Sequence, residues 1–141
     1  MHLGYASLGV SEGSVGFTSP ITFAATANAL LYCNARVRFC DVDPTTGALD
    51  PESLEKTIGE ESLDPEKTHL VIPVSYAGRV APLGEVAAIA RENGLSVVED
   101  AAHSLGSYGE RNGEKTSSAS CERTNASVLS FHPVKHLCAG E

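Results

Sequence analysis

The apolar positions of this chain recur with two spacings, which predict strands and helices in alternation. Continuous or alternating apolar runs, typical of strands, occupy residues 14–19, 36–42, 70–74, 95–98 and 127–131. Helical segments are predicted at 3–10, 22–33, 51–58 and 82–93. Strands that alternate with helices in this order predict an α/β fold, a three-layer sandwich in which a mostly parallel sheet lies between helices.

The predicted helices at 22–33 and 51–58 each have a candidate N-cap. Thr22 is expected to cap the first helix and Asp50 the second. The segment 22–33 is almost unbroken Ala, Leu and Phe, so this helix is expected to be buried on all sides. By contrast, residues 104–125 contain several glycines and a polar run, which predict loops.

Polar residues follow three of the predicted strands. Asp100 comes after the run at 95–98, Ser75 and Tyr76 come after the run at 70–74, and a third group lies in the segment leading to Lys135. In open parallel sheets, ligands gather at the carboxyl ends of the strands. These three groups are therefore the candidates for a binding site.

Length and charge narrow the classes of partner. The 141 residues are enough for one domain, and their formal charge of −8 argues against nucleic acid or an anionic membrane surface, because those partners need clustered Lys and Arg. No run approaches the ~20 apolar residues of a membrane span. The four cysteines contain no C-x-x-C pair and suggest neither a metal site nor a disulfide framework. An acidic cytoplasmic enzyme for a small molecule fits best.

Lys135 is the one lysine of four that has apolar neighbours on both sides. It lies between the segments 128–131 and 137–140, so its ammonium is expected to be partly desolvated, which favours the neutral amine. A neutral lysine can form a Schiff base with a carbonyl compound or with pyridoxal phosphate. The alternative is that Lys135 ends a strand and extends its charge into water.

Asp100 and His103 are candidates for contacts to such a cofactor. Asp100 follows two valines and Glu99, so it is expected to be half-buried at a strand end. It could hold the cationic nitrogen of a pyridinium ring, or it could cap the turn that begins at Ala101. His103 would lie on the same side of that turn, either bonded to the phenolic oxygen of the cofactor or as a structural histidine.

Ser130 and Phe23 complete the candidate set. Ser130 lies at the end of its predicted strand, where a hydroxyl can meet a phosphate oxygen. Phe23 opens the helix predicted at 22–33 and could stack on an aromatic ring, although a phenylalanine there also fits a core position. Neither residue type identifies a site by itself.

Four segments together carry a resemblance to a known family. They read TSPITFAATAN at 18–28, DVDP at 41–44, VEDAAHSLG at 98–106 and SFHPVK at 130–135. In this order they resemble the DegT/DnrJ/EryC1/StrS sugar aminotransferases, fold type I enzymes that depend on pyridoxal 5′-phosphate. Within that family the chain is most similar to enzymes that aminate 4-keto-6-deoxy nucleotide sugars on the way to pseudaminic acid.

The resemblance implies a role for each candidate residue. Lys135 matches the Schiff-base lysine of the family. A subgroup that removes a sugar hydroxyl has histidine at this position, so the lysine implies transamination. Asp100 matches the partner of the pyridine nitrogen, and Phe23 the ring that stacks on it. His103 matches a contact to the ring oxygen and Ser130 a contact to the phosphate. The implied reaction moves an amino group from an amino acid, glutamate by resemblance, to a nucleotide-linked keto sugar through a Lys135 aldimine, in a homodimer.

The chain also departs from the family. Family members are more than twice as long, so residues 1–141 are expected to be part of the large domain that binds pyridoxal phosphate, without the N-terminal phosphate loop and the C-terminal small domain. Ser75 stands where the family usually has histidine. The alternative function is a catalytically inactive fragment or binding module that retains only the fold. A nucleotide-binding oxidoreductase would need G-x-G-x-x-G after the strand at 14–19, which is missing there.

Overall fold

The computed structural model describes residues 1–111 and 113–139 of the chain. Its centre is a five-stranded sheet in the order β2-β1-β3-β4-β7, in which all neighbouring strands are parallel. The strands are β1 (Val15–Thr18), β2 (Arg36–Phe39), β3 (Leu70–Ile72), β4 (Ser96–Asp100) and β7 (Ala126–Val128). The five predicted strands are confirmed, although the last ends at Val128 and not at residue 131.

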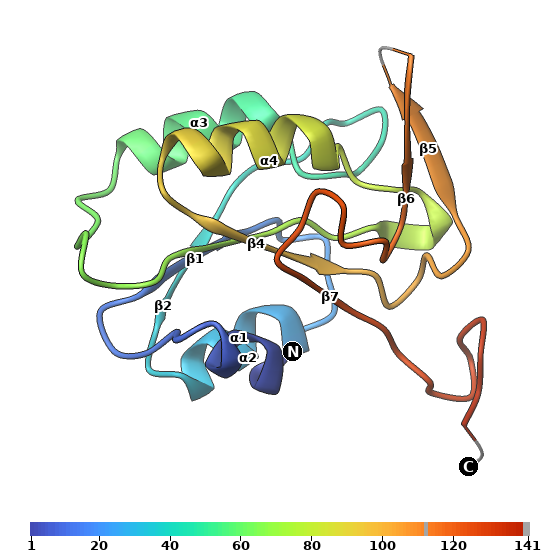
Figure 1. The fold of residues 1–141 in the computed structure, drawn as a ribbon, viewed down its shortest axis with the longest axis horizontal. Coiled ribbons are helices and arrows are strands. Elements are labelled where there is room, and N and C mark those ends of the chain that lie inside the picture. The colour runs from blue at the N-terminus through green and yellow to red at the C-terminus, as the bar shows by residue number, and fades with distance from the viewer. Residues whose placement is uncertain (112, 140–141) are drawn as a thin grey trace.

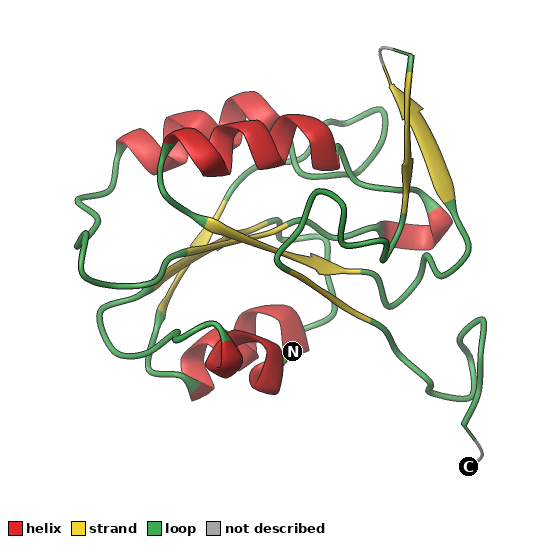
Figure 2. Cartoon of the chain, viewed as in Figure 1, coloured by secondary structure: helices red, strands yellow, loops and turns green. Residues whose placement is uncertain are grey.

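Helices cover both faces of the sheet (Figures 1 and 2). Helices α1 (His2–Ser7) and α2 (Ala25–Tyr32) lie on one face, and α3 (Pro51–Gly59) and α4 (Leu83–Glu92) lie on the other. This arrangement of layers confirms the predicted α/β sandwich with a mostly parallel sheet.

Successive strand residues fill the core on opposite faces of the sheet. Phe17 and Val97 belong to the apolar cluster under α3 and α4, whereas Val98 packs with Leu30 on the side of α1 and α2. Gly16 lies directly beneath Leu30, and a Cβ atom at this position would overlap the Leu30 side chain. Glycine therefore allows α2 to approach β1 closely.

The two predicted helix caps have different outcomes. Asp50 precedes α3, and its carboxylate accepts a hydrogen bond from the backbone N–H of Glu52 at 3.2 Å, which confirms this cap. The prediction for Thr22 is wrong, because α2 begins only after Ala24 and has no side-chain cap. The Thr22 hydroxyl lies instead 2.7 Å from the hydroxyl of Thr26.

Helix α2 is buried on one side only, and the prediction of burial on all sides is wrong. Thr26, Ala29 and Leu30 are buried, whereas Leu31 is exposed and Tyr32 is 67% exposed. Its Ala-rich and Leu-rich composition did not reveal this difference, because composition does not say which side of a helix meets a neighbour.

Residues 104–125, predicted as loops, contain a two-stranded antiparallel hairpin. Its strands are β5 (Tyr108–Arg111) and β6 (Glu114–Ser117), and they stand apart from the main sheet (Figure 1). The polar composition of these strands hides them from a search for hydrophobic patterns. The dipeptide Asn112-Gly113 in the sequence is the available signal, since it is typical of hairpin turns.

The described residues contain neither a membrane-spanning helix nor a cluster of metal ligands. No helix in 1–111 and 113–139 is long and apolar enough to cross a membrane. In the same part of the chain, no group of three or more His, Cys, Asp or Glu side chains is placed to hold a metal ion.

Candidate active site

A pocket of about 430 Å³ opens at the carboxyl ends of the parallel strands. Segments that follow β1, β3, β4 and β7 line it, as expected for an open parallel sheet. Its volume lies within the range of about 300–1,000 Å³ that is usual for small-molecule sites. The structure brings all five predicted site residues to this pocket: Phe23, Asp100, His103, Ser130 and Lys135.

Asp100 is the last residue of β4 and is 6% exposed, which is deeper than the half-buried position predicted. Its Oδ2 accepts a hydrogen bond from Oγ1 of Thr26 at 2.6 Å, and its Oδ1 accepts one from the backbone N–H of Ala102 at 3.2 Å. The second bond shows that Asp100 also holds the turn after β4. Within residues 1–111 and 113–139, no cationic side chain forms an ion pair with Asp100. A carboxylate has about four acceptor positions, so Asp100 keeps capacity for a ligand.

Thr26 is a site residue that the sequence pattern did not mark. It lies in the first turn of α2, and its carbonyl accepts a hydrogen bond from the Tyr5 hydroxyl at 3.0 Å. Burial first, and then the charge of Asp100, raise the pKa of Tyr5 well above its usual value, so this hydroxyl stays protonated and donates. The available signal was a polar side chain in a helix made mostly of Ala and Leu.

Glu99 precedes Asp100 in β4 and therefore points to the opposite face of the sheet. It is 0% exposed, and each of its two carboxylate oxygens accepts two hydrogen bonds. Oε1 accepts from the hydroxyls of Ser75 at 2.6 Å and Ser118 at 2.7 Å, and Oε2 from the backbone N–H of Ala119 at 2.8 Å and the hydroxyl of Ser127 at 3.2 Å. Its acceptor positions are thus filled by the protein itself.

Ser75 links the Glu99 network to the pocket. Its side chain is buried and donates to Glu99, while the residue lines the pocket next to Tyr76. Its Oγ also accepts the backbone N–H of Ala81 at 3.1 Å. At this position, where the resembling family usually has histidine, the chain has a hydroxyl that is engaged in structure.

His103 and Tyr76 form one wall of the pocket. The centroids of their rings lie 5.6 Å apart with an angle of 46° between the planes. Tyr76 begins a short 3-10 turn, η1 (Tyr76–Gly78), in which Ala77 has a φ of +51°, a left-handed conformation that is uncommon for alanine. This contact keeps the half-buried imidazole of His103 beside the pocket.

Phe23 and Ser130 lie at other parts of the pocket wall. Phe23 is 78% exposed, so it is not a core residue in this structure and its ring is available for stacking. Ser130 follows β7 and is half-buried, and its Oγ accepts the backbone N–H of His132 at 3.4 Å. Its hydroxyl proton can therefore be donated to a ligand.

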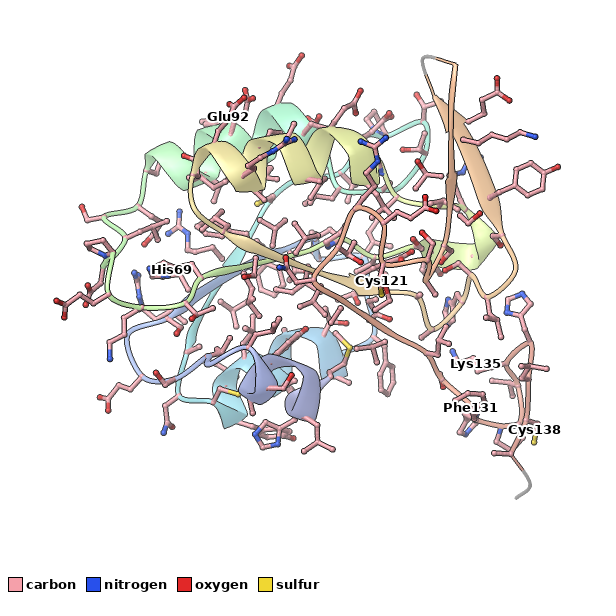
Figure 3. All side chains as sticks on the ribbon, in the orientation of Figure 1. His69, Glu92, Cys121, Phe131, Lys135 and Cys138 are labelled. Atoms are coloured by element: carbon pink, nitrogen blue, oxygen red, sulfur yellow. The ribbon has the colours of Figure 1, made fainter. Side chains whose placement is uncertain are left out.

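Lys135 lies on the segment that leaves the sheet after β7 (Figure 3). It is half-buried, and its backbone N–H donates to the carbonyl of His132 at 2.8 Å. Among the described residues, no carboxylate forms an ion pair with it. The pocket around it includes the apolar side chains of Val74, Val128 and Val134. An amine in these surroundings is available for chemistry.

Comparison with known proteins gives consistent matches over the whole chain. A model of the DegT/DnrJ/EryC1/StrS aminotransferase family matches residues 1–141. The UDP-4-amino-4,6-dideoxy-N-acetyl-beta-L-altrosamine transaminase of Campylobacter jejuni subsp. jejuni serotype O:23/36 (strain 81-176) is 36% identical over 141 residues, which cover 100% of this chain and 35% of that protein.

Two solved structures show the same fold. An aminotransferase of the DegT DnrJ EryC1 StrS type from Brucella abortus has a TM-score of 0.77 and 32% identity, over 95% of this chain and 35% of that one. PseC of Helicobacter pylori, an aminotransferase involved in the biosynthesis of pseudoaminic acid, has a TM-score of 0.72 and 26% identity, over 97% of this chain and 33% of that one. The chain spans about a third of the length of these relatives.

Proposed function

Because this chain belongs to the DegT/DnrJ/EryC1/StrS aminotransferase family, we propose that its protein transfers an amino group from an amino acid to a nucleotide-linked keto sugar. The observation that carries the proposal is one pocket that holds both Lys135, without an ion pair in the described chain, and Asp100, buried without a cation. By family resemblance, the amino donor is glutamate and the working form is a cytoplasmic homodimer.

The pocket suits pyridoxal 5′-phosphate, the cofactor of this family. A buried carboxylate with acceptor positions to spare fits a protonated ring nitrogen, and Asp100 is such a group. The exposed ring of Phe23 on the pocket wall fits a stacking contact with a pyridine ring. When bound, the cofactor supplies an electron sink for the charge that develops on the carbon bearing the amino group.

Each candidate residue has a proposed part in the reaction. Lys135 would hold the cofactor through Nζ and, once the amino donor has taken its place, would accept the proton of the donor carbon and pass it to the cofactor. Asp100 would face the protonated ring nitrogen, while His103 and Ser130 would hydrogen-bond to the phenolic oxygen and to the phosphate.

The sugar substrate is proposed from the relatives. The Campylobacter protein is a transaminase of a UDP-linked 4-amino-4,6-dideoxy sugar, and the Helicobacter protein serves pseudoaminic acid biosynthesis. A 4-keto-6-deoxy nucleotide sugar is the acceptor class that the sequence resemblance implies, and its amination would give a 4-amino-4,6-dideoxy sugar of the kind that the Campylobacter name contains.

Lys135 is tested by trapping the cofactor on it. Reduction of the protein with sodium borohydride in the presence of pyridoxal phosphate should fix the cofactor to the peptide that contains Lys135, as seen by mass spectrometry. Lys135→Ala should lose the label and reduce kcat/KM for amino transfer from glutamate to the keto sugar by at least about a thousandfold.

The matched control is Lys115→Ala. The Lys115 ammonium lies 5.4 Å from the centroid of the Tyr108 ring on the hairpin, and this residue does not line the active-site pocket. This variant should keep both the label on Lys135 and the turnover. Label on another lysine in the wild-type protein, or turnover retained by Lys135→Ala, would contradict the proposed function.

A further inference from the structure

Thr26 connects Asp100 to both helices on one face of the sheet. Its hydroxyl lies 2.6 Å from Oδ2 of Asp100 and 2.7 Å from the Thr22 hydroxyl, and its carbonyl accepts from Tyr5 of α1 at 3.0 Å. Thr26 is itself 0% exposed. With solvent excluded from Thr26, these protein contacts define the hydrogen bonding of this side chain.

The chemistry of the oxygens gives each hydrogen bond a direction. An ionised carboxylate only accepts, so the single hydroxyl proton of Thr26 is donated to Asp100. With that proton committed, Thr26 can only accept from Thr22, whose hydroxyl is the donor. The result is a relay in which Thr22 donates to Thr26 and Thr26 donates to Asp100.

We propose that Thr26 is a positioning residue for the cofactor, which holds the Asp100 carboxylate in one orientation so that its remaining acceptor positions serve the ring nitrogen. This inference rests on the proposed function. The hydrogen bond is charge-assisted and short, and such bonds are among the strongest between side chains.

An uncharged donor suits this task better than a cation. A lysine or arginine beside Asp100 would neutralise the carboxylate and weaken its attraction for a protonated ring nitrogen. The hydroxyl of Thr26 occupies one acceptor position and leaves the negative charge in place. Tyr5 adds to the positioning because it bonds to the carbonyl of Thr26 and ties the first turn of α2 to α1.

A packing role for Thr26 predicts a different result from a positioning role. Packing would preserve the shape of the pocket and affect every ligand of that shape equally. Positioning of Asp100 affects only ligands that carry a ring nitrogen. The carbocyclic analogue of pyridoxal phosphate, in which C–H replaces that nitrogen, separates the two roles.

The experiment measures dissociation constants of the purified protein for pyridoxal phosphate and for the carbocyclic analogue by absorbance titration. We define the preference ratio as the dissociation constant for the carbocyclic analogue divided by that for pyridoxal phosphate. In Thr26→Val this ratio should fall about tenfold toward unity, because a hydrogen bond to a charged group is lost while the shape of the side chain is kept. Thr26→Ser, which retains the hydroxyl, should keep the wild-type ratio. Should the valine variant not fold, Thr26→Ala is measured in its place, because it also lacks the hydroxyl but puts no methyl group against the carboxylate. The same fall in the ratio is expected.

Thr18→Val is the matched control. Thr18 is equally buried, but its hydroxyl donates to the backbone carbonyl of Ile72 at 2.8 Å, so this variant should keep the wild-type ratio. Equal weakening of both ligands in Thr26→Val, or no weakening, overturns the inference while leaving the labelling of Lys135 intact. Failure of the wild-type protein to bind pyridoxal phosphate overturns the proposed function and this inference with it.

Discussion

Glu99 and Asp100 are neighbours in β4, yet their carboxylates occupy different kinds of surroundings. Glu99 accepts four hydrogen bonds from the protein, whereas Asp100 accepts two and lines the active-site pocket. Because successive strand residues point to opposite faces, one step along the chain separates a carboxylate that holds structure from one that is available to a ligand.

The comparison shows which property distinguishes the two groups. Burial does not, since both are buried, and ion pairing does not, since neither has such a partner among the described residues. The two carboxylates differ in the number of acceptor positions that the protein fills. A buried carboxylate whose positions are all filled stabilises its own surroundings, whereas one with unfilled positions at a pocket can bind a cationic or N–H group.

Removal of the Glu99 side chain should give the largest effect on stability. Glu99→Ala leaves the backbone N–H of Ala119 and three hydroxyl groups without their acceptor and opens a cavity, so the free energy of unfolding should fall by about 3–5 kcal/mol. Urea denaturation followed by far-UV circular dichroism measures the change. The control is Glu12→Ala, at an exposed position. If the two variants lose similar amounts of unfolding free energy, the Glu99 network does not contribute to stability.

Asp100→Asn should affect ligand binding far more than stability. The amide keeps the shape of the side chain and one acceptor oxygen. The free energy of unfolding of the protein without cofactor should therefore change by less than about 1 kcal/mol. Binding of pyridoxal phosphate should weaken at least about tenfold, because the charge that meets the ring nitrogen is lost. Binding of the carbocyclic analogue is the internal control and should stay unchanged. A large loss of stability with no change in ligand preference would mean that Asp100, like Glu99, is a structural residue.

The sequence was sufficient to select Asp100 as a site residue, but it did not reveal the hydrogen bonds of either Asp100 or Glu99. The apolar run at 95–98 and the alternation of strands with helices are local patterns, and they predicted both the parallel sheet and a site at its carboxyl edge. The hydrogen bond between Thr26 and Asp100 joins residues 74 positions apart, and no local pattern encodes such a pair. The bond from Ser118 to Glu99 likewise depends on a loop whose path only the tertiary structure gives.

The incorrect prediction for Thr22 has the same origin. A threonine before an apolar helix is a reasonable cap by local rules. In the structure the hydroxyl contacts Thr26, because that side chain has already donated its proton to Asp100 and still accepts one hydrogen bond. Thr22 therefore takes part in a contact at the site and does not cap α2, and it forms part of the pocket wall.

The smallest effect should come from removing one donor of the Glu99 network. Ser118→Ala removes one of the four hydrogen bonds to Glu99, and it also removes the hydroxyl that lies 2.6 Å from the Ser104 hydroxyl. The free energy of unfolding should therefore be about 1 kcal/mol lower than in the wild type. The exposed Ser7→Ala is the control and should stay within about 0.5 kcal/mol. The preference for pyridoxal phosphate over the carbocyclic analogue should not change in either variant, because these contacts lie on the face of the sheet opposite to Asp100. A change in that preference in Ser118→Ala would mean that the two carboxylates are coupled through β4 and do not act independently.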